Sequence, residues 1–411
     1  MALHALTLLM VLPLGVKAGA ARCDITPPTG YPMWGYAARR DGPSVGVLDK
    51  LHARTLVLEA GKDRLALVSL DLGRAPPRGS YERLKAQARK LGVTALFLAA
   101  SHTHHGPVLE SDDWPTPKTS YVRSLEEKII ALIADACKAL KPARIGTASK
   151  ESALNRNRHS KRADAPVDRE LLVLRVEDAD GKAIATAVGF AAHPTMQPAK
   201  VFKFSADWPG AMAAEVEKRT GAPCLFLQGA AGDLSPNPRK DERGPEKFGK
   251  AVADEALKLK VECAALPKAV LKAREDEFSF KSRVPLDNEA VKAALSLAFY
   301  PALVEFFEKE YKDGIRPRLA TALLGEIAFV GVSAEVFCSH SLHLKRRARL
   351  PRLFFIGYCN DYHQYLPTIE AASEGGYGTE AWISPAAVGS GERVMDRALL
   401  RLYGMRGRIA E

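Results

Sequence analysis

The chain has 411 residues, of which 47% are hydrophobic and 26% are charged, and these proportions are ordinary for a soluble globular protein with a sizeable core. Its body contains no apolar run of about 20 residues, so we expect no transmembrane helix. The net charge of +11 favours anionic partners such as phospholipid surfaces or acidic glycans. No nucleic-acid motif occurs in the required context, and we expect no nucleic-acid partner.

The N-terminus has the pattern of an export signal. Residues 5–16 are apolar over the length of a signal peptide, and Ala18-Gly19-Ala20-Ala21 offers small residues for cleavage. We predict a signal peptide over residues 1–16 and export to the periplasm or the cell exterior, although Met1-Ala-Leu-His carries no Lys or Arg. A wrongly placed start or a buried N-terminal strand is the alternative.

Strand-like and helix-like segments alternate through most of the sequence, which predicts an α/β fold with mixed β-sheets flanked by helices. A capping-box pattern at Ser124-Leu-Glu-Glu127 predicts a helix that runs to Leu140. Asp207 is expected to cap another helix that closes before Gly221. The expected strands cover residues 64–70, 93–99, 171–177, 183–192, 223–227 and, as a pair, 319–332; further helices are expected over 81–91, 244–260, 288–311 and 389–402.

Potential metal ligands follow four apolar, strand-like runs. His102 and His104 follow the first, His193 the second, Glu335 the third, and the segment that contains Tyr365 the fourth. In open α/β sheets, ligands bind beyond the carboxyl ends of the strands, so these segments are expected to converge on one active site. Two histidines, one carboxylate and an open position are typical of a hydrolytic zinc site.

Each candidate has a purely structural alternative. The His102-Thr-His104 pair places both rings on one side of an extended backbone, but it also fits a polar loop. His193 fits a hydrogen-bonded core residue, whereas Glu335 needs a partner, because burying a lone carboxylate is costly. His340 and His343 are rival ligands, for which we favour a solvent-facing helix surface. The sequence has no C-x-x-C motif, so a cysteine zinc site is not expected.

Taken together, the segments resemble the catalytic N-terminal domain of the neutral/alkaline ceramidase family. The resemblance spans roughly residues 17 to 385. The sequence departs from the family pattern at His105 and at Asn157-Arg158. We also expect residues 17–411 to contain the catalytic domain without a C-terminal immunoglobulin-like domain. The segments that carry it are Lys17 to Pro28, Asp49 to Glu59, Ser101 to Pro107, Asn155-Arg156, Ala192 to Thr195, Ser205 to Gly210, Gln228 to Asn237, Ser333 to Glu335, Asn360 to Thr368 and Gly375 to Gly378.

The resemblance implies roles for particular residues. It implies that His102, His193, Glu335 and Tyr365 bind Zn²⁺, although tyrosine is outside the usual zinc ligands. It implies further that His104 is an acid/base or neighbouring group, and that Arg156 and Tyr377 face the scissile amide.

The resemblance predicts a zinc-dependent amidohydrolase that cleaves the N-acyl bond of ceramide or a related lipid to a fatty acid and an amine. Peripheral contact with an anionic membrane surface is consistent with the basic charge. One alternative is a zinc hydrolase of another N-acyl amide or of an ester. A second is a non-enzymatic, basic glycan- or membrane-binding protein, which would leave the ligands at the strand ends unexplained.

Overall fold

The computed structural model describes residues 15–40, 42–110, 120–298 and 301–410. Most of the predicted signal peptide therefore lies outside the described residues, and export remains a prediction. None of the helices in these four ranges combines the length and the apolar character that a membrane crossing requires.

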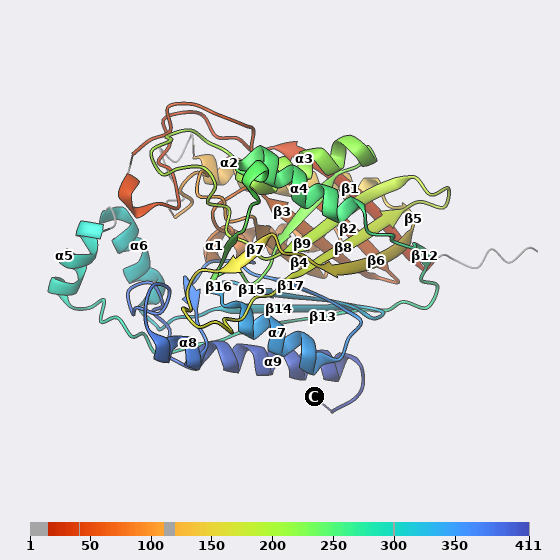
Figure 1. Ribbon diagram of the computed structural model, residues 1–411. Coiled ribbons are helices and arrows are strands. Elements are labelled where there is room, and N and C mark those ends of the chain that lie inside the picture. The colour runs from red at the N-terminus through yellow and green to blue at the C-terminus, as the bar shows by residue number, and fades with distance from the viewer. Residues whose placement is uncertain (1–14, 41, 111–119, 299–300, 411) are drawn as a thin grey trace, which may run out of the picture.

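Three mixed sheets form the body of the protein (Figure 1). The first has the order β4-β3-β2-β1-β5 and consists of β1 (Val16–Asp24), β2 (His52–Ala60), β3 (Asp63–Leu70), β4 (Ala95–Ala100) and β5 (Lys141–Pro142). The second has the order β10-β9-β8-β6-β12 and consists of β6 (Arg144–Glu151), β8 (Glu170–Glu177), β9 (Ala183–Phe190), β10 (Cys224–Gln228) and β12 (Ala264–Ala265). The third has the order β13-β14-β15-β17 and consists of β13 (Leu271–Glu277), β14 (Arg318–Leu324), β15 (Ile327–Val332) and β17 (Arg352–Ile356).

The helices cover the outer faces of these sheets. Figure 1 places α3 and α4 above the second sheet and α7 and α9 below the third. The main helices are α1 (Arg78–Lys90), α2 (Tyr121–Lys138), α3 (Asp207–Thr220), α4 (Pro245–Leu257), α5 (Glu289–Ala298), α6 (Pro301–Tyr311), α7 (Cys338–Ala348), α8 (Ile369–Glu374) and α9 (Ser390–Met405). The predicted α/β class, with mixed sheets flanked by helices, is confirmed.

One hydrophobic cluster joins the inner faces of all three sheets. Leu67 and Phe97 come from the first sheet, Leu174 from the second, and Phe329 and Phe354 from the third. Separate clusters attach α1 and α2 to the first sheet, α3 and α4 to the second, and α7 and α9 to the third. Burial of apolar area on both sides of each sheet fixes the sheets relative to one another.

Each of the three sheets contains one parallel pair of strands, formed by a strand–helix–strand crossover. The pairs are β3 and β4 connected through α1, β9 and β10 through α3, and β15 and β17 through α7. A parallel pair needs such a crossover, because its second strand must start at the same end as the first. The carboxyl ends of these strands therefore lie together. Two backbone hydrogen bonds connect them between sheets: Gly357 N, after β17, donates to Gln228 O of β10, and Ala100 N of β4 donates to Tyr358 O.

The small residues near the N-terminus belong to a strand. β1 starts at Val16 and pairs with β2 over its whole length, so cleavage between Ala18 and Ala21 would remove part of a strand that lies between β2 and β5. Gly19 lies against α2, where a methyl group would overlap the carbonyl oxygen of Ala136. Gly19 therefore permits close packing of the helix on the sheet.

Three local expectations need correction. The cap of α2 is Ser120, whose side chain accepts from Arg123 N, so the helix starts before the expected Ser124. The expected helix over 288–311 is two helices, α5 and α6. His340 is buried in α7 against Gly391, and only His343 has the expected exposed position.

Candidate active site

Three of the predicted ligands converge at the ends of the parallel strands. The Nε2 atoms of His102 and His193 are 3.0 Å apart, and each lies near Oε2 of Glu335, at 3.3 and 3.2 Å. These side chains follow β4, β9 and β15, so each sheet supplies one of them. All three are almost fully buried.

The orientation of the two imidazoles suits ligation. His102 Nδ1 lies 2.8 Å from Gly73 O, and His193 Nδ1 lies 2.7 Å from Ala231 O. Because a carbonyl oxygen only accepts, both Nδ1 atoms carry the proton and both Nε2 lone pairs face Glu335. Carbonyl partners of this kind fix the tautomer of metal-binding histidines. His102 also has a φ of 68°, a strained backbone conformation of the sort that clusters at functional sites.

Tyr365 lies beside Glu335 through a short sheet formed by β16 (Glu335–Val336) and β18 (Tyr365–Leu366), in which the two residues are paired. Its hydroxyl accepts from Arg158 Nη2 at 3.0 Å. The same nitrogen lies 3.0 Å from His193 Nε2. The structure thus brings all four predicted ligands together, with an arginine between two of them.

The structure does not bring Arg156 into this cluster. β7 (Asn155–Asn157) buries Asn155, whose amide donates to Asp168 O and Ala191 O, and strand alternation leaves Arg156 exposed. The strand then ends at Asn157, whose Oδ1 accepts from the backbone of the next turn. This turn directs Arg158 to the histidines, so Arg156 lies exposed outside the cluster and the guanidinium that contacts His193 and Tyr365 is that of Arg158.

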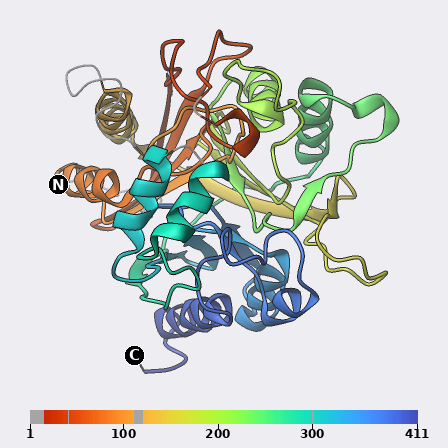
Figure 2. The ribbon, with the colours of Figure 1, turned by 90° about the vertical axis from the view of Figure 1, so that its left-hand side faces the viewer.

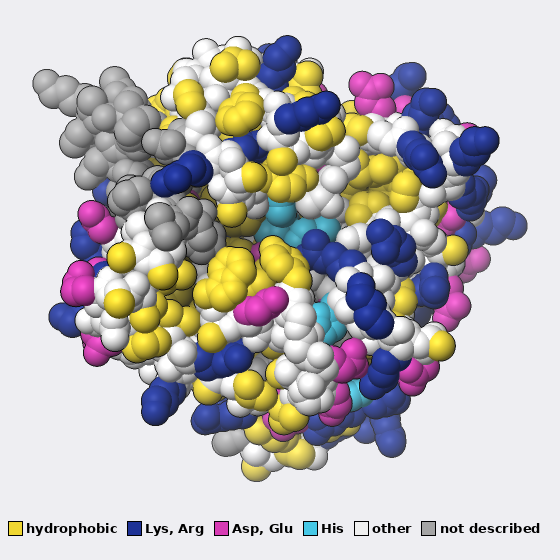
Figure 3. All heavy atoms as spheres, turned by 60° about the vertical axis from the view of Figure 1, so that its left-hand side comes forward, with side chains coloured by type: hydrophobic (Ala, Val, Ile, Leu, Met, Phe, Trp, Pro, Cys, Tyr) yellow, Lys and Arg dark blue, Asp and Glu magenta, His cyan; other side chains and the backbone are white. Residues whose placement is uncertain are grey.

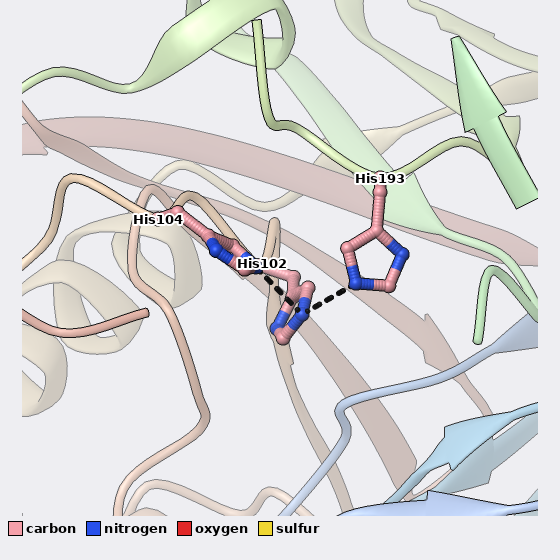
Figure 4. Close-up of side chains that lie close together, drawn as sticks. All are labelled: His102, His104 and His193. Carbon is pink, nitrogen blue, oxygen red and sulfur yellow. Dashed lines mark hydrogen bonds between the residues drawn. The ribbon is translucent and has the colours of Figure 1, made fainter. Parts of the chain in front are cut away.

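His104 and Tyr377 lie at the edge of the cluster. His104 Nε2 is 3.3 Å from His102 Nε2, and Figure 4 shows His102 between His104 and His193. Gly35 leaves room for the His104 ring, because a Cβ at Gly35 would overlap it. Tyr377 is 59% exposed, and its ring centroid lies 5.8 Å from that of Tyr365. Both side chains line a cavity above the cluster.

This cavity has a volume of about 210 Å³ and is mostly apolar. In Figure 3, histidine side chains form the floor of a hollow that hydrophobic side chains border. The cavity connects the polar cluster, through His104 and Glu335, to a wall of aromatic and aliphatic groups. That wall includes Met33, Trp34, Tyr36, Val108, Leu303, Phe307, Tyr362, Trp382 and Ile383.

The electrostatics of the cluster favour neutral imidazoles at His104 and His193 beside an ionised carboxyl at Glu335. Burial lowers the pKa of His104 well below its usual value, with His102 and His193 adding to the effect. Burial and the nearby Arg158 lower the pKa of His193 to about 3. Burial would raise the pKa of Glu335, but the adjacent imidazoles hold it well below its usual value. A neutral imidazole and an ionised carboxylate are the forms of these groups that bind a cation.

Several contributing residues were not predicted from the sequence. Tyr362 Oη donates to Glu335 Oε1 at 2.5 Å, and Tyr358 stacks on His102 at 4.1 Å between ring centroids. Trp34 packs edge-on against His102, His104 and Tyr362. Tyr362 lies within the segment already selected around Tyr365, but no local pattern marks Trp34, which reaches the site by a long-range contact.

Comparison with known proteins agrees with this architecture. A family model described as neutral/alkaline non-lysosomal ceramidase, N-terminal, matches residues 16–246. The solved neutral ceramidase from Pseudomonas aeruginosa superposes with a TM-score of 0.77 at 20% identity, covering 97% of this chain and 75% of that one. A second structure, a ceramidase complexed with C2, gives 0.76 at 20% identity, covering 97% and 76%.

The family match and the site together define the class of the protein, a hydrolase that acts on amide bonds. Within that class, the chain belongs to the neutral/alkaline non-lysosomal ceramidase family. The two structural likenesses agree with the predicted fold along nearly the whole chain.

Proposed function

We propose that this protein is a zinc-dependent amidohydrolase that cleaves the N-acyl bond of ceramide or a related lipid, releasing a fatty acid and an amine. The observation that carries the proposal is the convergence of two proton-free Nε2 atoms and the Glu335 carboxylate within 3.3 Å of one another. Two imidazoles and a carboxylate are a frequent donor set of catalytic zinc.

His102, His193, Glu335 and Tyr365 would hold the ion. Bound zinc supplies Lewis-acid polarisation of a carbonyl group and makes water more acidic. Burial and the Glu335 charge raise the pKa of the Tyr365 phenol well above its usual value, so Tyr365 stays protonated until a cation approaches. Arg158 now donates toward the His193 lone pair, and it must move away from that nitrogen when an ion binds.

The remaining side chains act on the substrate. Neutral His104 lies at the edge of the cluster. Its Nε2 atom accepts a proton from the attacking water and then donates that proton to the leaving amine. The Arg158 guanidinium and the Tyr377 hydroxyl donate to the carbonyl oxygen as negative charge develops on it. Trp34 covers the histidines and excludes water from that side.

The apolar wall of the cavity favours a lipid-like substrate. A long acyl or alkyl chain on Leu303, Phe307 and Ile383 gains about 25 cal/mol for each Å² of apolar surface removed from water. The cavity opens directly onto His104 and Glu335, so a chain in this position brings its polar end to the histidines.

Metal analysis together with a ceramide hydrolysis assay tests the proposal. We expect the purified protein to release fatty acid from short-chain ceramide, to lose this activity with a chelator, and to regain it with Zn²⁺. His102→Ala should reduce turnover to background, whereas His343→Ala, an exposed histidine on α7, should leave it unchanged. Full turnover of His102→Ala would refute the metal assignment.

A panel of other N-acyl amides and esters at matched chain length identifies the substrate class. The lipid amide should give the highest kcat/KM. Higher turnover of an ester would refute the amide assignment and leave the metal assignment intact.

A further inference from the structure

A second cluster of ligand-type side chains lies outside the proposed active site. It consists of Glu310 at the end of α6 and of Asp361 and His363 in the loop after β17. His363 Nε2 is 3.9 Å from Glu310 Oε1 and 3.9 Å from Asp361 Oδ2. One ligand atom from each residue lies within 4.8 Å of the other two, a spacing that a single ion can span.

The tautomer of His363 directs a lone pair into this cluster. His363 Nδ1 lies 3.2 Å from Ser333 O and 2.9 Å from Ser333 Oγ, which already accepts from Arg318 N. The proton therefore resides on Nδ1, and Nε2 is an acceptor. The side chain is 0% exposed, and Nε2 has no hydrogen-bond partner among the described residues.

Asp361 presents a second unpartnered acceptor to the same space. Its Oδ1 accepts from Arg74 Nη2 at 2.9 Å and from Tyr362 N at 2.8 Å, while the buried Oδ2 has no partner in the described part of the chain. Two buried lone-pair atoms facing each other, with a third from Glu310, are unfavourable unless a donor or a cation lies between them.

The surrounding charges leave negative charge uncompensated. Arg74 is shared between Asp361 and Glu110, and Arg78 is shared between Glu310 and Glu277. Arg318 is shared in turn between Glu277 and Glu82. Carboxylates therefore outnumber the guanidiniums that contact them, and a divalent cation would restore the balance.

We propose that Glu310, Asp361 and His363 bind a second divalent ion of the first transition row, such as Zn²⁺ or Mn²⁺. One imidazole with two carboxylates suits these ions, whereas Ca²⁺ and Mg²⁺ favour ligand sets of oxygen alone. Ligands about 2.1 Å from a tetrahedral ion are roughly 3.4 Å apart. The two separations from His363 Nε2, each 3.9 Å, would therefore have to shorten by about 0.5 Å.

The ion ties α6 to the loop that follows β17. α6 carries Leu303 and Phe307, which line the apolar cavity, and the loop carries Tyr362 and leads directly into Tyr365 at the start of β18. In Figures 1 and 2, α6 lies at the margin of the sheet body beside α5, so a connection at its C-terminal end fixes one wall of the cavity. The second ion is therefore structural, and it orders the lipid-binding side of the site.

Ion counting on site-specific variants tests this proposal independently of the activity. The full chain is stripped with a chelator, dialysed against Zn²⁺ alone or Mn²⁺ alone, and analysed for bound metal. We expect two Zn²⁺ ions per wild-type chain, one in Glu310→Gln, one in His363→Gln and one in His102→Ala. Glu308→Gln is the matched control, because this glutamate lies on the same helix but pairs with Lys292 at the surface, and it should retain both ions.

Thermal unfolding gives a second measurement. Metal should raise the melting temperature of His102→Ala through the second site, and it should not do so in the double variant His102→Ala, Glu310→Gln. Binding by Glu310→Gln and His363→Gln equal to that of the wild type would overturn the proposal and assign the space to a buried water molecule. If Glu310→Gln and His363→Gln each bound one ion fewer than the wild type while His102→Ala lost no ion, the active-site metal would be refuted and the second site would stand.

Discussion

At the scale of single residues, the two arginines near β7 show how a local turn decides which side chain reaches the site. Arg156 is exposed on the strand, and Arg158 contacts Gly232 O, His193 and Tyr365 after the strand ends. The sequence identifies a basic segment here, but the end of the strand depends on the side-chain hydrogen bonds of Asn155 and Asn157, which local spacing does not encode.

Arg158→Ala should therefore lower kcat/KM on short-chain ceramide by about 10²–10³-fold, because it removes a donor to the developing oxyanion. Arg156→Ala is the matched control and should change kcat/KM less than about twofold, since its side chain is exposed. Steady-state kinetics on both variants at saturating Zn²⁺ provide the measurement. A larger loss for Arg156→Ala than for Arg158→Ala would contradict the placement described above.

At the scale of elements, the three crossovers account for what the sequence predicted well. His102, His193 and Glu335 each follow a buried strand, and the rule that ligands bind at strand ends placed them together correctly. Tyr365 required the family resemblance, because its position depends on β18 pairing with β16. Trp34 was not predicted, because it lies in an irregular segment that reaches the histidines only through tertiary packing.

The contact between β1 and α2 gives a stability prediction. Gly19→Ala should destabilise the fold by about 1–3 kcal/mol, because the added methyl group overlaps the backbone of α2 and the helix must move. Gly46→Ala is a suitable control, as its Cβ would make only ordinary contact with the Lys203 side chain, the nearest atom lying at 3.6 Å. Chemical denaturation of both variants measures the difference, and equal midpoints would contradict this packing.

Asp207, the first residue of α3, gives a pH prediction. Asp207 accepts from Gln197 N and Trp208 N, and burial raises its pKa from 3.8 to about 6. At pH 7 this carboxyl is ionised in both the folded and unfolded states. Between pH 6 and 4 the folded state alone binds the proton, so the contribution of Asp207 to stability rises as the pH falls, by up to about 3 kcal/mol.

Asp207→Asn should lack this contribution. On going from pH 7 to pH 5, the unfolding free energy of the wild type should therefore increase relative to that of the variant. Denaturant titration of both proteins at each pH measures this change. A difference that does not vary with pH would show that the Asp207 carboxyl has an ordinary pKa.

At the scale of the whole molecule, charge and apolar surface meet at the entrance to the cavity. The net charge is +11, and Figure 3 shows Lys and Arg side chains around the hollow that contains the histidines. Tyr377 and Trp382 are 59% and 41% exposed at the cavity. Aromatic groups within a basic surface favour an anionic lipid interface, where a lipid substrate is present.

We expect binding to vesicles that contain phosphatidylserine and much weaker binding to vesicles of phosphatidylcholine alone, as measured by co-sedimentation. Raising the salt concentration from 0.05 to about 0.5 M should weaken the binding, because screening shortens the range of the charge interaction. Trp382→Ala should reduce it further, whereas Leu400→Ala, an exposed residue of α9, should not. Equal binding of both vesicle types would contradict this prediction.

The dispersal of the four proposed ligands over three crossovers has a consequence for biosynthesis. The segments with His102 and His193 leave the ribosome well before Glu335 and Tyr365 are translated, so a nascent chain cannot complete the coordination sphere. We therefore expect the proposed metal to bind late, after translation, once the third sheet has docked on the other two.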